Sequence, residues 1–337
     1  MNGTIYIVTG AAGHLGGHVT RQLLEKGKNV RAFVLPSERS HMEKIQCAKL
    51  EIFSGDICDP DSLKAVFEKK EGMDFIVIHC AGIISILEKE DECVRRVNVE
   101  GTANMIGACK KYGVKRLVYI SSVHAIPEQP QGVITYEAKH FSPELVRGCY
   151  AKTKAEATQL VLDASAEGLN AVVIHPAGII GPGAPKSSNM MHLIIKFAGG
   201  KLPAAVHGGF DFVDVRDVAA GVVAASESGK NRECYILGSK WYDLREFFDL
   251  LAEAAHRKKL KLYLPFWAVK LFVPIAETYY KLANKTPLFT SYSLFTLRQN
   301  AIYSHEKAQK EFGYKVRPLK ETFQDILAYL KEEGILG

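Results

Sequence analysis

The chain has 337 residues, of which 47% are hydrophobic and 24% are charged, so it is long enough for one or two globular domains and too apolar to be disordered. Its net charge of +6 is modest for this length and gives no reason to expect a nucleic-acid partner. The seven cysteines form no CxxC pair, so we expect no metal site. No apolar run reaches the roughly 18 residues of a membrane span, and a predicted strand begins within five residues of Met1, which leaves no room for a signal peptide. We therefore expect a cytoplasmic protein.

The first predicted element is a buried strand over Ile5–Val8, which is followed by glycines at three-residue spacing and then by a helical pattern. Glycine has no β-carbon, so the chain can turn sharply here and its backbone can approach a pyrophosphate. The helix N-terminus directs free N–H groups at the phosphates. The sequence therefore predicts a dinucleotide-binding turn, although this spacing also occurs in ordinary strand–helix connections. The residues assigned to the turn are Gly10, Gly13, His14, Leu15 and Gly16.

Five further apolar runs are predicted as strands, and helical patterns lie between them. The strands are Val30–Leu35, Leu50–Phe53, Phe75–His79, Arg116–Ile120 and Ala171–His175. The helices are Val19–Glu25, Ser62–Lys70, Val94–Lys111 and Tyr150–Ala166. This alternation predicts an α/β fold with a Rossmann-type, doubly wound parallel sheet. Ligands of such sheets bind beyond the carboxyl ends of the strands, so the residues that follow each strand are candidates for a site.

The second half of the chain is less regular. Residues 182–185 (PGAP) indicate a crossing point, Phe212–Ala225 a strand end that runs into a helix, and Cys234–Leu237 a seventh strand returning to the sheet. Beyond them we expect a smaller, mostly helical region that binds the substrate. The predicted division is 1–182 with 209–238 for the dinucleotide-binding domain, and 183–208 with 239–337 for the substrate-binding region.

The reactive groups are predicted at Tyr150 and Lys154, which share one face of a helix because they lie four residues apart. A phenol with a pKa of about 10 is a weak base at neutral pH, and a nearby cation favours its ionised form. Tyr303 and Lys307 have the same spacing. No serine pair at a strand end precedes them, as one precedes Tyr150, so the sequence favours a structural role for Tyr303.

Several motifs follow one another along the chain. They are TGAAGHLG at 9–16, GDI at 55–57, HCAG at 79–82, NVEGT at 98–102, ISS at 120–122, YAKTK at 150–154 and HPAGIIGPG at 175–183. In this combination the chain resembles the extended short-chain dehydrogenase/reductase superfamily, and most closely its dihydroflavonol 4-reductase and 3β-hydroxysteroid dehydrogenase branch. The resemblance covers nearly the whole chain and implies an NAD(P)-dependent enzyme.

The resemblance implies roles for individual residues. Ser122 would hydrogen-bond the substrate oxygen, Tyr150 would transfer a proton, and Lys154 would hold the ribose hydroxyls of the cofactor. The other implied cofactor contacts are Gly10, Gly13 and Gly16 at the pyrophosphate, Asp56 and Ile57 at the adenine, Ala81 and Gly82 beside the ribose, and Pro176 near the nicotinamide.

Two further residues near these motifs are expected to have structural roles, and a third has two possible roles. Ser121 is expected to stabilise its loop, and Asn98 its helix. His124 follows Ser122 by two residues, and it either faces the substrate or is a solvated loop histidine.

The end of the second strand departs from the family pattern. Many NAD-specific relatives carry an aspartate there for the ribose hydroxyls, whereas this chain has Val34 followed by Leu35. Without that carboxylate a 2′-phosphate is not repelled, so NADP is favoured over NAD. The arginine often seen in NADP-using relatives is also missing, which leaves Arg39, with Ser37, as the nearest candidate to contact the phosphate.

A second departure concerns the substrate. Phe210 stands where nucleotide-sugar epimerases commonly carry an arginine that grips a diphosphate, and a phenyl ring cannot make that contact. We therefore expect an oxidoreductase that interconverts a secondary alcohol and a ketone, or reduces an aldehyde, on a fairly apolar small molecule. The alternatives are a nucleotide-sugar epimerase or dehydratase with retained NAD, and a non-catalytic NADP-binding sensor.

The basic run 256–261 precedes an apolar stretch over Leu262–Ala276. These residues either cap the substrate cleft as packed helices or form an interfacial segment in which Trp267 and Phe272 enter a lipid surface. Peripheral membrane contact through 256–276 is therefore one expectation, and the resemblance adds a homodimer.

Overall fold

The computed structural model describes residues 3–68, 71–86, 88–186, 188–267, 269 and 291–336. Its main feature is a seven-stranded sheet in the order β10-β6-β5-β4-β1-β2-β3, in which every neighbouring pair runs parallel. The strands are β1 (Gly3–Thr9), β2 (Asn29–Val34), β3 (Leu50–Ser54), β4 (Met73–His79), β5 (Arg116–Ile120), β6 (Ala171–Pro176) and β10 (Cys234–Leu237). Each of these strands was predicted from the sequence, with ends that differ by at most two residues.

The strands of this sheet are continuous apolar runs, as expected for strands that helices cover on both faces. In β1, Ile7 and Val8 have no exposed surface, and the neighbouring β4 buries Val77 and Ile78 completely. The strands β2 and β3 lie on one side of β1 in the sheet, and β4, β5 and β6 lie on its other side. Right-handed crossovers therefore place helices on opposite faces, and the predicted doubly wound α/β fold is confirmed.

The helices around the sheet form two layers. They are α1 (His14–Glu25), α2 (Arg39–Met42), α3 (Glu92–Arg95), α4 (Gly101–Lys111), α5 (Cys149–Ala166) and α7 (Val215–Ser228). On one face α1 and α7 pack against each other, and on the other face α4 packs against α5.

Two predicted helices differ from the structure. Within Ser62–Lys70 the described residues form only a 3₁₀ turn at Ala65–Phe67, and residues 69 and 70 lie outside the described part of the chain. The Ser62 hydroxyl donates to the carbonyls of residues 56 and 59, so side-chain bonds replace the first helical turn. Val94–Lys111 is interrupted by a π-helical turn at Arg96–Glu100, which separates α3 from α4.

A second group of elements lies beyond the large sheet. It contains a three-stranded sheet in the order β11-β9-β7, a two-stranded sheet of β12 and β8, and helices. The strands are β7 (Gly178–Ile180), β8 (Ala205–Val206), β9 (Gly209–Asp214), β11 (Trp241–Asp243) and β12 (Tyr263–Leu264). The described helices of this group are α6 (Asn189–Ala198), α8 (Leu244–Ala254), α10 (Ser291–Thr296) and α12 (Leu319–Glu332), whereas α11 (Glu306–Phe312) packs against α7 and against β10 of the large sheet.

The segment 209–238 divides between the two groups. Its strand β9 pairs with β7 and β11 in the small sheet, whereas β10 joins the large sheet beside β6. The helix α7 between them packs against β4, β5 and β6. The chain therefore crosses from one group of elements to the other within this segment.

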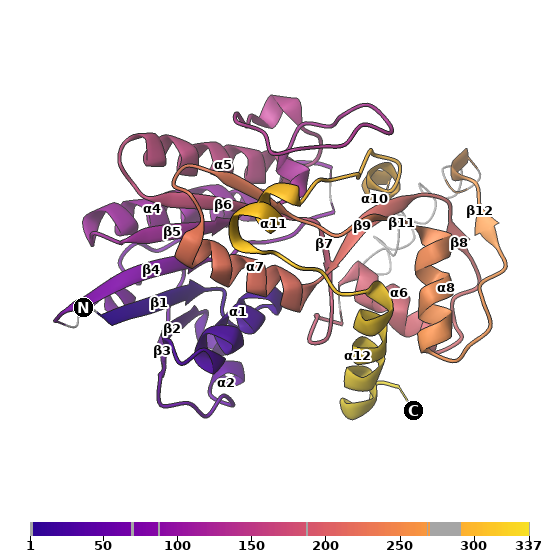
Figure 1. The fold of residues 1–337 in the computed structure, drawn as a ribbon, viewed down its shortest axis with the longest axis horizontal. Coiled ribbons are helices and arrows are strands. Elements are labelled where there is room, and N and C mark those ends of the chain that lie inside the picture. The colour runs from indigo at the N-terminus through magenta and orange to yellow at the C-terminus, as the bar shows by residue number, and fades with distance from the viewer. Residues whose placement is uncertain are drawn as a thin grey trace.

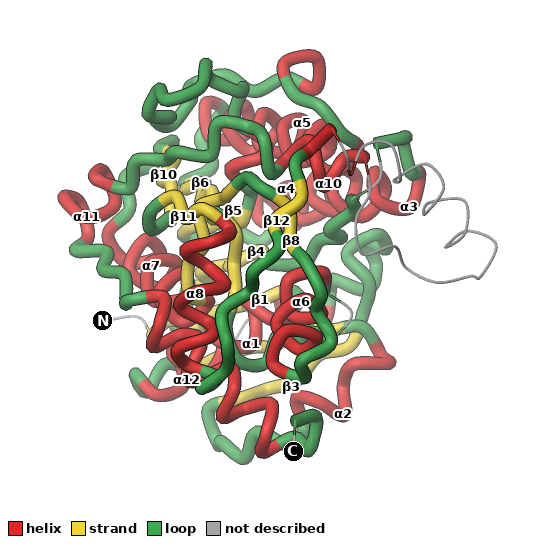
Figure 2. Tube along the Cα trace, turned by 90° about the vertical axis from the view of Figure 1, so that its right-hand side faces the viewer, coloured by secondary structure: helices red, strands yellow, loops and turns green. Residues whose placement is uncertain are grey.

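The carboxyl ends of the parallel strands face the second group of elements. In Figure 1, β1 begins beside the N marker at the left and points toward β7, β9 and α8 on the right. Figure 2 looks onto that right-hand side and shows β8 and β12 beside each other, with α8 and α6 to either side. Among the described residues, no helix combines the length and the hydropathy that crossing a membrane requires.

Candidate active site

The glycine turn after β1 has no room for side chains. Gly10 has a φ of +62°, and a β-carbon there would lie 2.9 Å from the backbone of Ala81. A β-carbon on Gly16 would lie 2.2 Å from the Gly10 carbonyl oxygen, which accepts a hydrogen bond from the Gly13 N–H at 2.9 Å. The turn is thus built from backbone packed on backbone at the start of α1, and we call Gly10, Gly13 and Gly16 the glycine cradle.

The N-terminus of α1 fits an anionic group. Its N-cap is Gly13, which offers no capping side chain, and its first turn carries no acidic residue. The first N–H groups of the helix and the positive end of its dipole therefore remain available to a pyrophosphate. Together with the cradle, this feature fits the dinucleotide that the sequence predicts.

His14 and Leu15, which the sequence assigns to the cofactor-binding turn, have side chains that contact other parts of the protein. The Nε2 atoms of His14 and His18 both lie within hydrogen-bonding distance of the Pro182 carbonyl oxygen, at 3.1 and 3.0 Å. Burial lowers the pKa of His14 to about 4, so the ring is neutral and donates one proton to that carbonyl. Leu15 packs against the core. These side chains tie α1 to the crossing at residues 181–183.

Asp56 and Ile57, which were expected at the adenine, lie in a turn after β3 that a side-chain hydrogen bond stabilises. One carboxylate oxygen of Asp56 accepts the Cys58 N–H at 2.9 Å, and the Ile57 side chain is buried against Gly101. The Ile57 side chain therefore supports the turn from the core side. Arg39 lies nearby, where its guanidinium donates to the Ile52 carbonyl at 3.2 Å and pairs with a carboxylate one helical turn away.

Lys154 lies deep in the site, beside the turn that follows β4. Its ammonium donates to the Ile120 carbonyl at 2.7 Å and lies 3.4 Å from the position of a β-carbon on Gly82. Burial lowers the pKa of Lys154 to about 8. Gly82 is thus placed beside Lys154 and Ala81 against Gly10, and Pro176 is buried at the end of β6.

Ser122 and Tyr150 meet at the carboxyl end of β5. A hydrogen bond from Ser122 lowers the pKa of Tyr150, but burial has the larger effect and raises it to about 12. The cation that the sequence assigned to lowering this pKa, Lys154, is bound to the Ile120 carbonyl. In the free protein Tyr150 is therefore protonated at neutral pH and able to donate a proton.

The backbone around Ser122 is fixed by its neighbours. Its carbonyl accepts a hydrogen bond from His175 Nδ1 at 2.9 Å, and its hydroxyl oxygen accepts the His124 N–H at 3.2 Å. The hydroxyl of Ser121 is bonded to Thr158 at 2.6 Å, in line with the loop-stabilising role expected for it. The Asn98 side chain bonds both the N–H and the carbonyl of Ile83, so it holds the loop after β4.

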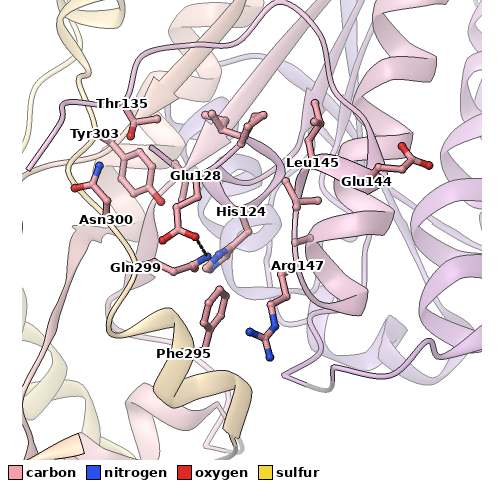
Figure 3. A pocket seen from close by; sticks show the side chains of 15 residues that line it. His124, Glu128, Thr135, Glu144, Leu145, Arg147, Phe295, Gln299, Asn300 and Tyr303 are labelled. Carbon is pink, nitrogen blue, oxygen red and sulfur yellow. Dashed lines mark hydrogen bonds between the residues drawn. The ribbon is translucent and has the colours of Figure 1, made fainter. Parts of the chain in front are cut away.

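A cavity of about 380 Å³ opens beside Tyr150, between α5 and the C-terminal segments. Figure 3 shows the side chains that line it, which come from the loops after β5, from the approach to α5 and from the region around α10. They include His124, Glu128, Leu145, Arg147, Phe295 and Tyr303. This volume lies within the range of ligand pockets, about 300–1,000 Å³.

Tyr303, for which the sequence favours a structural role, lines this cavity. Its ring meets Phe210 at 6.3 Å between centroids, and Phe210 in turn stacks on His124 at 5.4 Å. Arg147 and Phe295 were not singled out from the sequence. No motif marks them, since they come from segments that only the folded chain brings together.

The described residues contain no cluster of three or more histidine, cysteine, aspartate or glutamate side chains suited to a metal ion. The candidate site therefore consists of the glycine cradle, the Ser122–Tyr150–Lys154 group and the cavity beside Tyr150. These three parts lie along the carboxyl ends of the strands of the large sheet.

Known proteins resemble this chain over almost all of its length. A putative dihydroflavonol 4-reductase from Synechocystis sp. is 29% identical over 333 residues, which cover 98% of this chain and 95% of the relative. The 3 beta-hydroxysteroid dehydrogenase type 7 of Mus musculus is 28% identical and covers 92% of this chain and 91% of its own. The crystal structure of gox2253 is 30% identical, covers 99% of both chains and superimposes with a TM-score of 0.84.

The family itself follows from a broader match. The model of the NAD dependent epimerase/dehydratase family matches residues 6–238, which include the glycine cradle, Ser122, Tyr150 and Lys154. The relatives named above confirm the resemblance to dihydroflavonol reductases and hydroxysteroid dehydrogenases. The chain belongs to the NAD-dependent epimerase/dehydratase family and is an NAD(P)-dependent enzyme of the extended short-chain dehydrogenase/reductase type.

Proposed function

We propose that the protein is an oxidoreductase that interconverts a secondary alcohol and a ketone on an apolar small molecule. The observation that carries this proposal is the cavity beside Tyr150, whose wall contains the aromatic rings of His124, Phe295 and Tyr303. The buried Phe210 supports this wall, because it stacks on His124 and meets Tyr303 edge to face. Aromatic faces offer apolar contact to a ring-shaped substrate and no grip for a diphosphate. Among the relatives, the printed names are those of a reductase and a dehydrogenase.

The side chains of Ser122 and Tyr150, next to His124 in the cavity wall, support a proton transfer to the substrate oxygen. When bound, the nicotinamide supplies or accepts the hydride. The Ser122 oxygen already accepts the His124 N–H, so Ser122 acts as a donor with its own proton, toward Tyr150 in the free protein and toward the substrate oxygen when a substrate is bound. Tyr150, protonated at neutral pH, delivers the proton to that oxygen. Lys154, held by the Ile120 carbonyl, binds the ribose beside Gly82.

The nucleotide-sugar alternative lacks a phosphate-binding cation at the expected place. Phe210 is 7% exposed and fills that place with a ring. Arg147 lines the cavity, but its guanidinium lies over the Phe295 ring at 4.4 Å and pairs with Glu88 at 2.6 Å. Its charge is therefore already engaged within the protein.

Turnover of reduced cofactor tests the proposal directly. We expect the purified protein to oxidise NADPH or NADH in the presence of bicyclic or steroid ketones, followed as loss of nicotinamide absorbance. An epimerase would instead convert a nucleotide sugar without any net change in that absorbance. Cofactor binding without turnover of any ketone, aldehyde or nucleotide sugar would favour the sensor.

We propose NADP as the preferred cofactor. No carboxylate follows β2, where Val34 is succeeded by an exposed Leu35, so a 2′-phosphate meets no fixed negative charge at the strand end. Arg39 stands at the ends of β2 and β3, held by hydrogen bonds to the Ile52 carbonyl and the Ser54 hydroxyl. A guanidinium in this position can make charge-assisted hydrogen bonds to a phosphate.

Replacing this arginine separates the two cofactors. Arg39→Ala is expected to raise the Kd for NADPH about tenfold, because one charge-assisted hydrogen bond of about 1.5 kcal/mol is lost, and to change the Kd for NADH less than about twofold. Fluorescence titration of both reduced cofactors measures the effect. Arg21→Ala is the matched control, since Arg21 lies on the exposed side of α1. Equal weakening of both cofactors would contradict the assignment.

We also propose peripheral contact of residues 256–267 with an anionic lipid surface. Lys258 and Lys261 are exposed, and Leu262 and Trp267 beside them are 52% and 71% exposed. Basic residues next to exposed apolar side chains suit an anionic lipid surface. Residues 268 and 270–276, including Phe272, lie outside the described part of the chain.

The two tryptophans allow a direct test of this contact. In a Trp241→Phe background the emission comes from Trp267 alone. It is expected to shift to shorter wavelength with phosphatidylglycerol vesicles at low salt, and to stay unchanged with phosphatidylcholine vesicles, because both charge and apolar insertion are required. Failure of the protein to sediment with the anionic vesicles would remove the proposal.

A further inference from the structure

Lys154 is a buried cation that is held by neutral groups. It is 5% exposed, and its ammonium donates to the Ile120 carbonyl at 2.7 Å and to the Tyr119 hydroxyl at 3.4 Å. Among the described residues no carboxylate forms an ion pair with it. An ammonium has three N–H donors, so one donor remains for the cofactor, whose ribose is expected beside Gly82.

Tyr119 contacts this cation in two ways. Besides the hydrogen bond, its ring centroid lies 4.9 Å from the ammonium of Lys154. Tyr119 belongs to β5 and has no exposed surface, and burial raises its pKa far above the usual range, so its hydroxyl stays neutral. A neutral acceptor and an aromatic face both favour the charged form of the lysine. Unlike a carboxylate, they add no negative charge that would repel the phosphates of the cofactor.

The position of Tyr119 is fixed by the neighbouring strand. His79 of β4 lies opposite Tyr119 in the sheet, with 5.8 Å between the ring centroids. The ring nitrogens of His79 lie 2.7 Å from the Thr9 hydroxyl and 3.3 Å from the Thr102 hydroxyl. Both nitrogens therefore have partners, and the imidazole gives the tyrosine a fixed neighbour.

We propose that Tyr119 is a positioning residue for Lys154, whose hydroxyl and ring face keep the lysine as an ammonium ion in place for the ribose of the cofactor. The inference rests on the role that the proposed function gives to Lys154. Tyr119 has no exposed surface, so it acts through the lysine and not by touching the cofactor or the substrate itself.

The other titratable groups around the ammonium are uncharged at neutral pH. Burial raises the pKa of Cys80 and that of Tyr150 to about 12. It lowers the pKa of His79 to about 3 and that of His175 to about 4. Burial also lowers the pKa of Lys154 to about 8. The charge of the lysine therefore depends on its neutral partners, and the loss of one of them lowers its pKa further.

The pH dependence of cofactor binding tests this role. Binding requires Lys154 in its charged form, so the Kd rises as the pH passes above the pKa of this lysine in the free protein. Tyr119→Phe keeps the ring and removes the hydroxyl, and should lower that pKa by about one unit, which one hydrogen bond to a charged group supplies. Fluorescence titration with NADPH should then give a Kd about fivefold above the wild type at about pH 8, and less than about twofold above it at about pH 6.5. Equal weakening at both pH values would mean that Tyr119 only packs the core, and the proposal would be wrong.

Tyr235→Phe is the matched control. Tyr235 is also fully buried in the large sheet, the ammonium of Lys307 lies 4.8 Å from its ring centroid, and its hydroxyl is bonded to Glu311 of α11. This variant loses the same atom from a similar environment and should keep the wild-type pH profile. The same shift in both variants would overturn the proposal, because a general loss of stability would then explain it.

A second test removes the lysine. In a Lys154→Met background, Tyr119→Phe should change the Kd for NADPH by less than about twofold, because the hydroxyl acts only through the ammonium. A tyrosine substitution that weakens binding equally with and without the lysine would contradict a positioning role.

A measurement without cofactor separates this inference from the proposed function. ¹³C NMR of protein with lysine labelled at Cε follows the titration of Lys154, whose signal is assigned by its absence in Lys154→Met. We expect the midpoint in Tyr119→Phe to lie about one pH unit below that of the wild type. A lowered midpoint supports the role of Tyr119 even if no ketone is reduced, and an unchanged midpoint overturns it.

Discussion

Tyr150→Phe is expected to lower kcat for ketone reduction about 10³-fold, within the range of a lost general acid. The reason is chemical rather than steric, because phenylalanine keeps the ring that packs against His124 and removes only the proton donor. Burial raises the pKa of Tyr150 to about 12 although the Ser122 hydrogen bond acts in the opposite direction, so the proton is present throughout the neutral range. Steady-state oxidation of NADPH with a ketone substrate measures the loss.

Cofactor binding should be spared in the same variant. The glycine cradle and Lys154 are unchanged, so the Kd for NADPH is expected to stay within about threefold of the wild type. Tyr136→Phe is the matched control, since its hydroxyl belongs to a side chain that is 57% exposed. A Tyr150→Phe enzyme that retains more than about a tenth of its kcat would show that another group donates the proton.

The strands and the residues at their ends could be predicted because each is encoded locally. An apolar run such as Arg116–Ile120 marks a buried strand, and the serines that follow it must then lie at the carboxyl edge of the sheet. Tyr150 and Lys154 are equally local, because four residues make one helical turn. The glycine turn is local as well, because its three glycines directly follow β1 in the chain.

The cavity could not be predicted in this way. Tyr303 and Phe210 meet across more than ninety positions of the chain, and their contact depends on how the C-terminal segments return to α5. Tyr303 and Lys307 share the spacing of Tyr150 and Lys154, yet Lys307 bonds Glu233 and the Cys234 carbonyl, outside the cavity. The same spacing therefore has different meanings, because Tyr150 and Lys154 lie on one helix whereas Tyr303 precedes α11 and forms a bridge with Thr135.

The directions in which the pKa values of Tyr150 and Lys154 shift could not be predicted from the sequence either. A lysine one turn from a tyrosine suggests a lowered phenol pKa, but the result depends on how far both groups are desolvated. In the structure burial lowers the pKa of Lys154 and raises that of Tyr150. The free protein therefore resembles the state needed to protonate a ketone oxygen, and a bound positively charged nicotinamide would act on Tyr150 in the opposite direction.

Gly16→Ala is expected to raise the Kd for NADPH about 100-fold, which corresponds to about 2.7 kcal/mol. The new methyl group would lie 2.2 Å from the Gly10 carbonyl oxygen, and Gly10 cannot move aside freely. Its N–H is bonded to the Phe33 carbonyl at 3.0 Å, and its carbonyl accepts the Gly13 N–H. The turn must therefore open, which withdraws the N–H groups of α1 from the phosphates.

Gly17→Ala provides the contrast, because Gly17 is the next residue of the same helix. A β-carbon there meets the Ala11 carbonyl oxygen at 3.4 Å, an ordinary contact, and alanine favours a helix over glycine by up to about 1 kcal/mol. We expect Gly17→Ala to keep the Kd within about twofold and to raise Tm slightly, whereas Gly16→Ala lowers Tm. Fluorescence titration and thermal unfolding of both variants decide the matter, since equal effects at the two positions would mean that the packing of Gly16 on Gly10 does not shape the cofactor cradle.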